Sequence, residues 1–231
     1  TPPGLGVTMA FTNAMSIETV LGGTGDDVFD ASAMTLSIEL RGGLGADTLT
    51  GGSAGDILRG GIDGDVDTLN GGGGNDTLLF STGDILTGGA GNDNAIAEDD
   101  GGVTLTLAAG HGIETVLGGA GGDMLDASAS TTRVVLDGRG GIDTIHGGAA
   151  NDLLYLSDGD TASGGAGTDI VTLVATAGAG VGATLLSGVE VVFGSAFDDI
   201  VDATATTAAN TNGRLDVRAG AGADQVTGGT G

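Results

Sequence analysis

Residues 42–59 read GGLGADTLTGGSAGDILR, in which one nine-residue pattern occurs twice. Each half has glycine at its first two places, aspartate at the sixth and leucine at the eighth. Glycine adopts backbone angles that a Cβ would penalise, so the start of each half predicts a tight loop. The last three residues are too few for a helix and suit a short strand with one inward side chain. The stretch therefore predicts loops and strands in alternation.

The pattern G-G-x-G-x-D-x-U-x, where U is a larger apolar residue, occurs twelve times, and every copy keeps the aspartate. The copies start at residues 22, 42, 51, 60, 71, 88, 118, 138, 147, 164, 194 and 219, and the copy at 60 carries two extra residues. Those at 194 and 219 are looser. Repetition at a fixed short period is typical of a solenoid, in which each unit packs on its neighbours.

A longer period lies over the short one. Ile17-Glu18 recurs as Ile113-Glu114 and again as Val189-Glu190. The first interval exceeds the second by the length of Gly51–Asn70, which is one pair of short units. A pair can be inserted without disturbing its neighbours only if two units close one coil of about 18 residues. We predict one elongated segment of a longer protein, with modules at 16–111, 112–187 and 188–231, the last incomplete.

The predicted fold class is all-β: a parallel β-roll, or β-helix solenoid, with essentially no helix. Neighbouring coils would stack about 4.8 Å apart as parallel sheets around a thin apolar core. Degenerate coils are expected at 31–41, 127–137 and 203–218, and a strand at 103–107. The inward side chains are predicted to be Phe29, Leu49, Leu58, Leu69, Leu78, Leu125, Ile145, Leu154, Val171 and Val201.

Composition narrows the function. The chain has 50 glycines, 31 acids and 6 bases, for a formal charge of −25. Nucleic-acid binding is excluded, because the chain has too few basic residues to neutralise phosphates. Such charge opposes a compact state unless cations bind, so we expect a largely unfolded chain without them. Of the acids, 26 are Asp, a short carboxylate suited to hard cations. Calcium accepts six to eight oxygens, carbonyls included, whereas zinc would need the His and Cys that the chain almost lacks. Absence of Cys also excludes disulfides.

The nonapeptide resembles the RTX, or haemolysin-type, calcium-binding repeat of bacterial proteins exported by type I secretion. The resemblance implies a parallel β-roll in which each Ca²⁺ lies between loops one coil apart, held by sixth-position aspartates and loop carbonyls. Carried over to this sequence, the metal ligands would be Asp27, Asp47, Asp56, Asp67, Asp76, Asp93, Asp123, Asp143, Asp152, Asp169, Asp199 and Asp224.

Several copies depart from the pattern. Asp56 and Asp152 follow loops with alanine at the fourth place, where a left-handed residue other than glycine costs about 1–2 kcal/mol. Asp199 follows GSAF, and Asp67 follows an insertion that also offers Asp63 and Asp65. The segment 63–67 does not match an EF-hand, because that loop needs glycine and glutamate at places where this chain has neither.

Other acids and the histidines have simpler interpretations. Asp30, Asp126 and Asp202 end their repeats before a small residue, which favours a role in turns. The recurrent Glu18, Glu114 and Glu190 are expected to mark module boundaries through a hydrogen bond or ion pair, with a calcium role as the alternative. His111 and His146 have no counterparts between modules and are expected at the surface.

Three functions stay open at this stage. The favoured one is a calcium-dependent structural segment of a secreted bacterial cell-surface protein, such as an S-layer subunit or adhesin, which folds outside the cell. The alternative is an accessory calcium-binding module of a secreted protease, lipase or polysaccharide-modifying enzyme. Catalysis within the segment is not expected, because no catalytic motif occurs. The expected partners are calcium ions, with self-association and cell-surface polysaccharide left open, and without nucleic acid or membrane insertion.

Overall fold

The computed structural model describes residues 4–176, 178–206 and 215–228. The chain forms two compact units, one of Thr1–Asp99 with Gly110–Thr115 and the other of Asp100–Ala109 with Val116–Gly231. Each unit is a parallel β-solenoid, and a 3-10 turn at Asn13–Met15 is the one helical segment among the described residues. The predicted fold class is confirmed. No described helix has the length and apolar character to cross a membrane.

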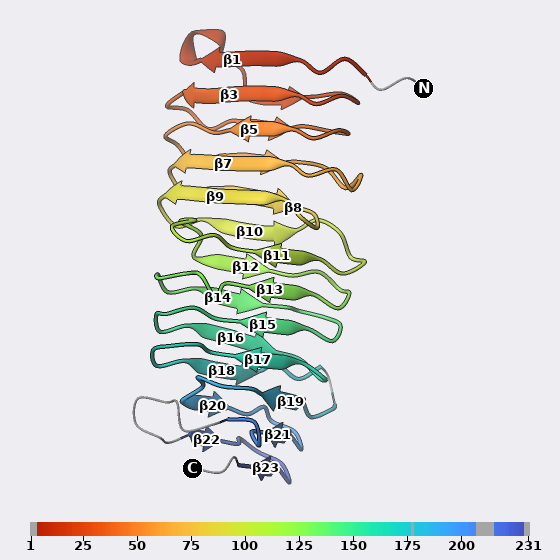
Figure 1. Cartoon of the computed structure of the whole chain (residues 1–231), viewed down its shortest axis with the longest axis vertical. Helices are drawn as coiled ribbons and strands as arrows, with labels where there is room; N and C mark the ends of the chain where they lie inside the picture. The colour runs from red at the N-terminus through yellow and green to blue at the C-terminus, as the bar shows by residue number, and fades with distance from the viewer. Residues whose placement is uncertain (1–3, 177, 207–214, 229–231) are drawn as a thin grey trace. The chain divides into compact units, whose positions relative to one another are not determined.

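In the first unit, short strands form two parallel sheets, and the chain passes from one sheet to the other at every strand (Figure 1). One sheet has the order β1 (Thr8–Thr12), β3 (Val28–Ala33), β5 (Thr48–Thr50), β7 (Thr68–Gly73) and β9 (Ile85–Ala90). The other has the order β2 (Thr19–Leu21), β4 (Glu39–Arg41), β6 (Ile57–Arg59), β8 (Thr77–Phe80) and β10 (Asn94–Ala97). The alternation follows from the repeat, because each nonapeptide supplies one loop and one strand.

The second unit has the same construction. One sheet has the order β11 (Thr104–Thr106), β13 (Met124–Asp126), β15 (Thr144–His146), β17 (Thr161–Ser163), β19 (Gly182–Leu185), β21 (Ile200–Asp202) and β23 (Gln225–Thr227). The other contains, in order, β14 (Val135–Asp137), β16 (Leu153–Leu156), β18 (Ile170–Leu173), β20 (Val191–Phe193) and β22 (Asp216–Arg218). Strand β12 (Thr115–Leu117) contains the boundary between the units. The strand predicted at 103–107 is β11.

The core consists of ladders of inward side chains, one from most strands and two from the longer strands such as β8 and β16. Leu40, Leu58 and Leu78 stand in register on β4, β6 and β8, and each is fully buried. Residues on either side of them face outward, as the alternation of a strand requires. All ten inward positions predicted from the sequence are buried.

The coils are not uniformly 18 residues long, as the pair of nonapeptides had suggested. Equivalent aspartates are 20 residues apart between Asp47 and Asp67, 17 between Asp67 and Asp84, and 18 between the Ile38 and Asp56 rungs. Strand register is kept in each case, so the loops take up the difference in length. The inserted segment Gly51–Asn70 adds one strand to each sheet, β6 and β7.

The predicted module boundaries stay a prediction. The first was placed at 111 and 112, and the two structural units divide within 99–116. The degenerate coils at 31–41 and 127–137 contribute strands β4 and β14. The coil at 203–218 contributes β22, while its residues 207–214 lie outside the described residues.

Truncation of a ladder side chain tests the core. We expect Leu58→Ala to lower the free energy of unfolding by about 2–5 kcal/mol, because a fully buried leucine leaves a cavity. The neighbouring Ile57 is 42% exposed, so Ile57→Ala is the matched control and should cost at most about 1 kcal/mol. Urea unfolding in saturating calcium measures both, and equal losses would contradict the assigned orientation of β6.

Candidate calcium sites

The sixth-position aspartates form stacks that run across the coils. In each stack, Oδ1 of one aspartate accepts a hydrogen bond from the backbone N–H of the aspartate one coil earlier. Asp47 Oδ1 accepts from Asp27 N–H at 2.7 Å, and Asp67 Oδ1 accepts from Asp47 N–H at 2.8 Å. These aspartates are almost completely buried, at 0–1% exposure. The repeat therefore places a buried carboxylate on successive coils of a stack. A hydrogen bond from a backbone N–H joins each carboxylate to the coil before it.

There are five such stacks in the described chain, and each belongs to one unit. Stacks 1 and 2 lie in the first unit and stacks 3, 4 and 5 in the second. In order along the sequence, the members are Val7, Asp27, Asp47, Asp67 and Asp84 in stack 1; Ile38, Asp56, Asp76, Asp93 and Glu114 in stack 2; Val103, Asp123, Asp143 and Asp160 in stack 3; Val134, Asp152, Asp169 and Glu190 in stack 4; and Val181, Asp199 and Asp224 in stack 5.

All twelve predicted ligand residues occupy these stacks. Asp67, rather than Asp63 or Asp65 of the insertion, is the buried member at its coil. Asp199 also holds a stack position, with Asp224 on the following coil. Asp224 is half-buried, whereas the other eleven are buried. The twelve residues are thus brought together as successive rungs in separate runs, while their role as ligands stays a prediction.

The second carboxylate oxygen divides the repeat loops into two kinds. In five repeats, Oδ2 accepts a hydrogen bond from the backbone N–H of the second residue of the same loop, and we call these loops closed. Their donor and acceptor pairs are Gly23–Asp27, Gly52–Asp56, Gly119–Asp123, Gly148–Asp152 and Ser195–Asp199. A closed loop satisfies its own carboxylate with its own backbone.

In the other seven repeats, which we call open, this bond is missing. Six of their aspartates have a buried Oδ2 with no hydrogen-bond partner in the described structure: Asp47, Asp67, Asp76, Asp93, Asp143 and Asp169. The seventh is the repeat of Asp224. A buried polar atom without a partner costs about 1–3 kcal/mol, and more when it is charged. Six such atoms in one small fold indicate that a cation belongs beside them.

Backbone angles separate the two kinds independently. In six of the seven open loops, φ is positive at both the second and the fourth residue, as in Gly43 at 117° and Gly45 at 110°. The exception is the loop with the insertion, where Gly61 at 158° is nearly extended. In the closed loops, all of which are described in full, neither place has a positive φ. Ala54 and Ala150 therefore carry no left-handed strain, contrary to the expectation from the sequence.

In eleven of the twelve repeats the first residue is a glycine, which makes room for the carboxylate; the repeat at 219 has alanine there. A Cβ on Gly42 or Gly138 would collide with Oδ2 of the aspartate five residues later. The carboxylate therefore lies in a cradle of backbone that any side chain would fill. Among the described residues no three carboxylate or imidazole side chains converge on one point. Calcium needs six to eight oxygens, so loop carbonyls would supply those that the aspartates do not. Glycine-rich backbone with orphaned carboxylate oxygens fits that ion.

Burial changes the acidity of the stacked carboxyls. Burial is the main cause that raises the pKa of Asp47 to about 6, with neighbouring carboxylates adding to it and the bond from Asp27 N–H opposing it. The same causes raise the pKa of Asp67 and of Asp169 to about 7. Carboxyls that resist ionisation at neutral pH mark places where a bound cation would stabilise the charged form.

Four acidic stack members were not among the predicted ligands. Asp84 and Asp160 end stacks 1 and 3, although neither belongs to a nonapeptide. Glu114 and Glu190 end stacks 2 and 4, where Oε2 accepts from the N–H of Asp93 and Asp169, both at 2.7 Å. The sequence carried a signal for them, because Gly-Asp recurs at 83–84 and 159–160 in aligned segments. Glu114 and Glu190 thus make the hydrogen bonds expected of them, whereas Glu18 is exposed, and their place at module boundaries stays a prediction.

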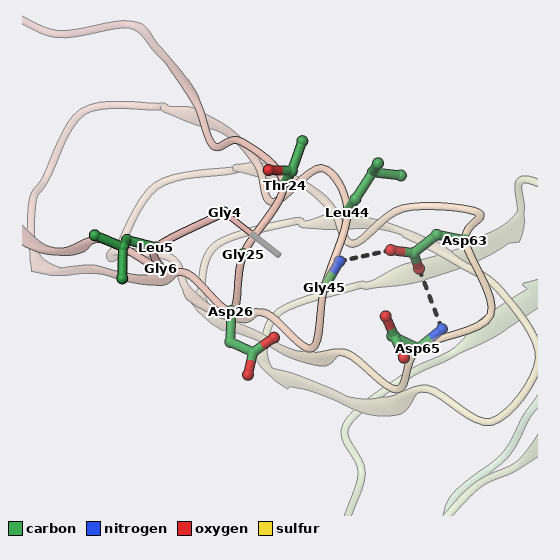
Figure 2. A pocket seen from close by; sticks show the side chains of 10 residues that line it. All are labelled: Gly4, Leu5, Gly6, Thr24, Gly25, Asp26, Leu44, Gly45, Asp63 and Asp65. Atoms are coloured by element: carbon green, nitrogen blue, oxygen red, sulfur yellow. Dashed lines mark hydrogen bonds between the residues drawn. The ribbon is translucent and has the colours of Figure 1, made fainter. Parts of the chain in front are cut away.

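The outer side of stack 1 has a hollow of about 710 Å³ between Gly4–Gly6, Thr24–Asp26 and the inserted loop (Figure 2). Asp63 lies at its edge and accepts hydrogen bonds from the N–H groups of Gly45 and Asp65. Asp26 Oδ1 accepts from Ala46 N–H at 3.0 Å. These exposed acids hold loop backbone, whereas Asp27 is buried.

Two smaller expectations have different outcomes. Asp30, Asp126 and Asp202 accept hydrogen bonds from the N–H two residues later, all at 2.9 Å, which is the bond of an Asx turn, although all three residues belong to strands, β3, β13 and β21. His111 was expected at the surface and this was wrong, because the residue is 2% exposed. Its Nδ1 accepts from Ile113 N–H, and its carbonyl accepts from Gly88 N–H. The residue therefore helps to connect the last two coils of the first unit.

Comparison with protein families agrees with this geometry. The model of the RTX calcium-binding nonapeptide repeat matches residues 16–33, 39–66, 64–84, 80–100, 135–162 and 216–231, which together cover more than half of the chain. The chain belongs to the RTX family. RTX nonapeptide repeats bind several Ca²⁺ ions, so calcium is the cation that the orphaned carboxylates imply. No curated protein and no solved structure matches the chain significantly.

Second-position glycines of the two kinds of loop provide a matched pair. Gly43→Ala should destabilise the calcium-bound RTX fold by more than about 1–2 kcal/mol, because φ is 117° and the new Cβ would meet the carbonyl of Gly23. Gly23→Ala should have little effect, because nothing lies within 4 Å of its Cβ position. Thermal unfolding in calcium measures both. Equal destabilisation would contradict the distinction between open and closed loops.

The raised pKa values of the stacked aspartates predict a pH dependence of the calcium-free chain. Folded-state pKa values of about 6–7 lie above the value of about 3.9 in an unfolded chain. Between these limits the folded state binds more protons, so the free energy of unfolding should fall as pH rises from about 4 to 7. We expect stronger β-type circular dichroism at pH 5 than at pH 7.5 in chelator. A stronger signal at pH 7.5 would contradict the assignment.

Proposed function

We propose that this RTX chain is a calcium-dependent structural segment of a bacterial cell-surface protein, of the S-layer or adhesin type. RTX repeats form a structural calcium-binding module and occur in secreted bacterial proteins, which places the chain in a secreted protein. The surface role goes further and is supported by the duplicated architecture. Stacks 3 and 4 of the second unit repeat the arrangement of stacks 1 and 2 in the first, and a whole coil has been inserted into the first unit.

The observation that carries the proposal is the set of six buried carboxylate oxygens without a partner. In the absence of cations, like charges on successive coils repel one another, and a net charge of −25 adds to that repulsion. We propose that the twelve sixth-position aspartates act as ligands, in pairs from consecutive coils, with carbonyls of the glycine loops completing each shell. Calcium supplies the positive charge that offsets the stacked carboxylates, and the glycine loops position the carbonyl oxygens.

Calcium-dependent stacks would make folding of the chain depend on the calcium concentration, which differs between the inside and the outside of the cell. Extracellular calcium modules bind with dissociation constants of about 10⁻⁴–10⁻³ M, which cytosolic calcium does not reach. The chain would stay unfolded inside, where it can be threaded through an exporter. Outside, binding to the folded state would stabilise it in proportion to the number of ions bound.

Calcium titration tests the folding step. The chain should show little β-type circular dichroism in excess chelator at pH 7.5 and a cooperative gain in millimolar calcium, because metal binding and folding are coupled. Magnesium at the same concentration is the control and should give less structure, since it prefers stricter octahedral sites and retained waters. Full β structure in chelator would refute calcium-dependent folding.

Cell labelling tests the surface role. Antibodies raised against this chain should label intact cells that produce the full-length protein, and brief chelation should reduce the labelling as the segment unfolds. Antigen found only in the culture medium, together with a hydrolytic activity, would instead support an accessory module of a secreted enzyme.

A further inference from the structure

The order of residues within the stacks is the same in all of them. Each begins with a valine or isoleucine, whose N–H donates to the first aspartate: Val7, Ile38, Val103, Val134 and Val181. The first aspartate always lies in a closed loop, and every later repeat in the stack is open. Stacks 1 to 4 then end on an acid that belongs to no nonapeptide. Stacks 1 to 4 are thus runs with a defined start and end, and stack 5 has a defined start.

The start has a structural cause. In an open loop the second residue lies against the carbonyl of the second residue of the repeat one coil earlier in the same stack. Gly72 lies in this way against Gly52 O, and Gly165 against Gly148 O. A repeat that opens a stack has no such loop before it. Its second residue therefore turns its N–H inward, onto its own aspartate. Ala54, Ala150 and Phe197, which replace the fourth glycine, all lie in these opening repeats, where a positive φ is not required.

The aspartates at the ends of stacks 1 and 3 differ from those of the open repeats, because backbone N–H groups bond to both of their carboxylate oxygens. Asp84 Oδ1 accepts from Asp67 N–H, and its Oδ2 accepts from Ser81 N–H at 2.7 Å. Asp160 is bonded in the same way, to Asp143 N–H and to Ser157 N–H. Both oxygens of these aspartates are therefore satisfied by backbone. They lie in short Ser-x-Gly-Asp turns that lack the glycine loop and its carbonyls.

Glu114 and Glu190 end the other two stacks with a longer side chain. Each reaches back with Oε2 to the N–H of the last repeat aspartate. Each residue stands directly before a strand, at the segments HGIE and SGVE, so a single positive-φ glycine, Gly112 or Gly188, accompanies its carboxylate in place of the G-G-x-G loop. In all four cases the stack keeps its backbone hydrogen bond at the last rung, while the loop that would surround a cation is missing.

We infer that Ca²⁺ occupies only the intervals between consecutive repeat loops, and that Asp84, Glu114, Asp160 and Glu190 terminate each run without binding an ion. The inference rests on the proposed role of the sixth-position aspartates as calcium ligands. The occupied intervals are Asp27–Asp47, Asp47–Asp67, Asp56–Asp76, Asp76–Asp93, Asp123–Asp143, Asp152–Asp169 and Asp199–Asp224, which makes seven. If the four terminal acids also bound ions, there would be eleven.

Ion counting on the whole chain separates these numbers. Native mass spectrometry of the 231-residue chain, equilibrated with millimolar calcium, should show seven ions, and equilibrium dialysis with radioactive calcium should give the same number. Adducts acquired in magnesium serve as the background. A count of zero would overturn the proposed function as well. Any other count leaves calcium binding intact and overturns the assignment of starts and ends.

Neighbouring rungs supply matched variants. Asp67→Asn should reduce the count to six, because Asp67 faces one repeat interval, whereas Asp84→Asn should keep seven ions and lower only the thermal stability. In stack 2, Asp93→Asn and Glu114→Gln form a second pair with the same expected contrast, which decides the question should Asp84→Asn not fold. Loss of an ion in Asp84→Asn or Glu114→Gln would show that the terminal acids are ligands and would overturn the inference.

Discussion

The hydrogen bond from the backbone N–H of one aspartate to the carboxylate of the next is the interaction on which the fold depends. It connects coils through the loops, where no strand pairing exists, and it fixes each carboxylate in the interior. The same bond creates the difficulty that the protein must solve. Two unit charges one coil apart, about 4.8 Å, repel by about 3 kcal/mol at an effective dielectric constant of 20. The fold of an RTX chain of this charge therefore depends on buried carboxylates, and these carboxylates require a bound cation as counter-ion.

Much of this arrangement is predictable from the sequence. The sixth-position aspartate and the eighth-position apolar residue recur together, so a register that buries Leu49 also buries Asp47. Because the side-chain period of a strand is two, no other register satisfies both. The parallel sheets, the inward ladder and the positions of all twelve aspartates follow from that single constraint.

The state of each loop and the ends of the stacks were harder to predict. Asp47 and Asp56 belong to adjacent nonapeptides, yet one Oδ2 is orphaned and the other accepts Gly52 N–H. The difference depends on what lies one coil earlier, 18 or 20 residues away, which a local motif does not encode. Asp84 was not predicted for a related reason. Its turn has no glycine loop, and its place in stack 1 depends on the hydrogen bond from Asp67 N–H, one coil earlier. His111 is buried by the neighbouring coil in the same way.

The coil Gly51–Asn70 lengthens the first unit without altering the register on either side of it. It adds a strand to each sheet and one carboxylate to each of two stacks in a single event. Growth of this fold is consequently stepwise, with a step of about 4.8 Å. Gain or loss of whole coils would therefore change the distance between the two ends of a roll in fixed increments.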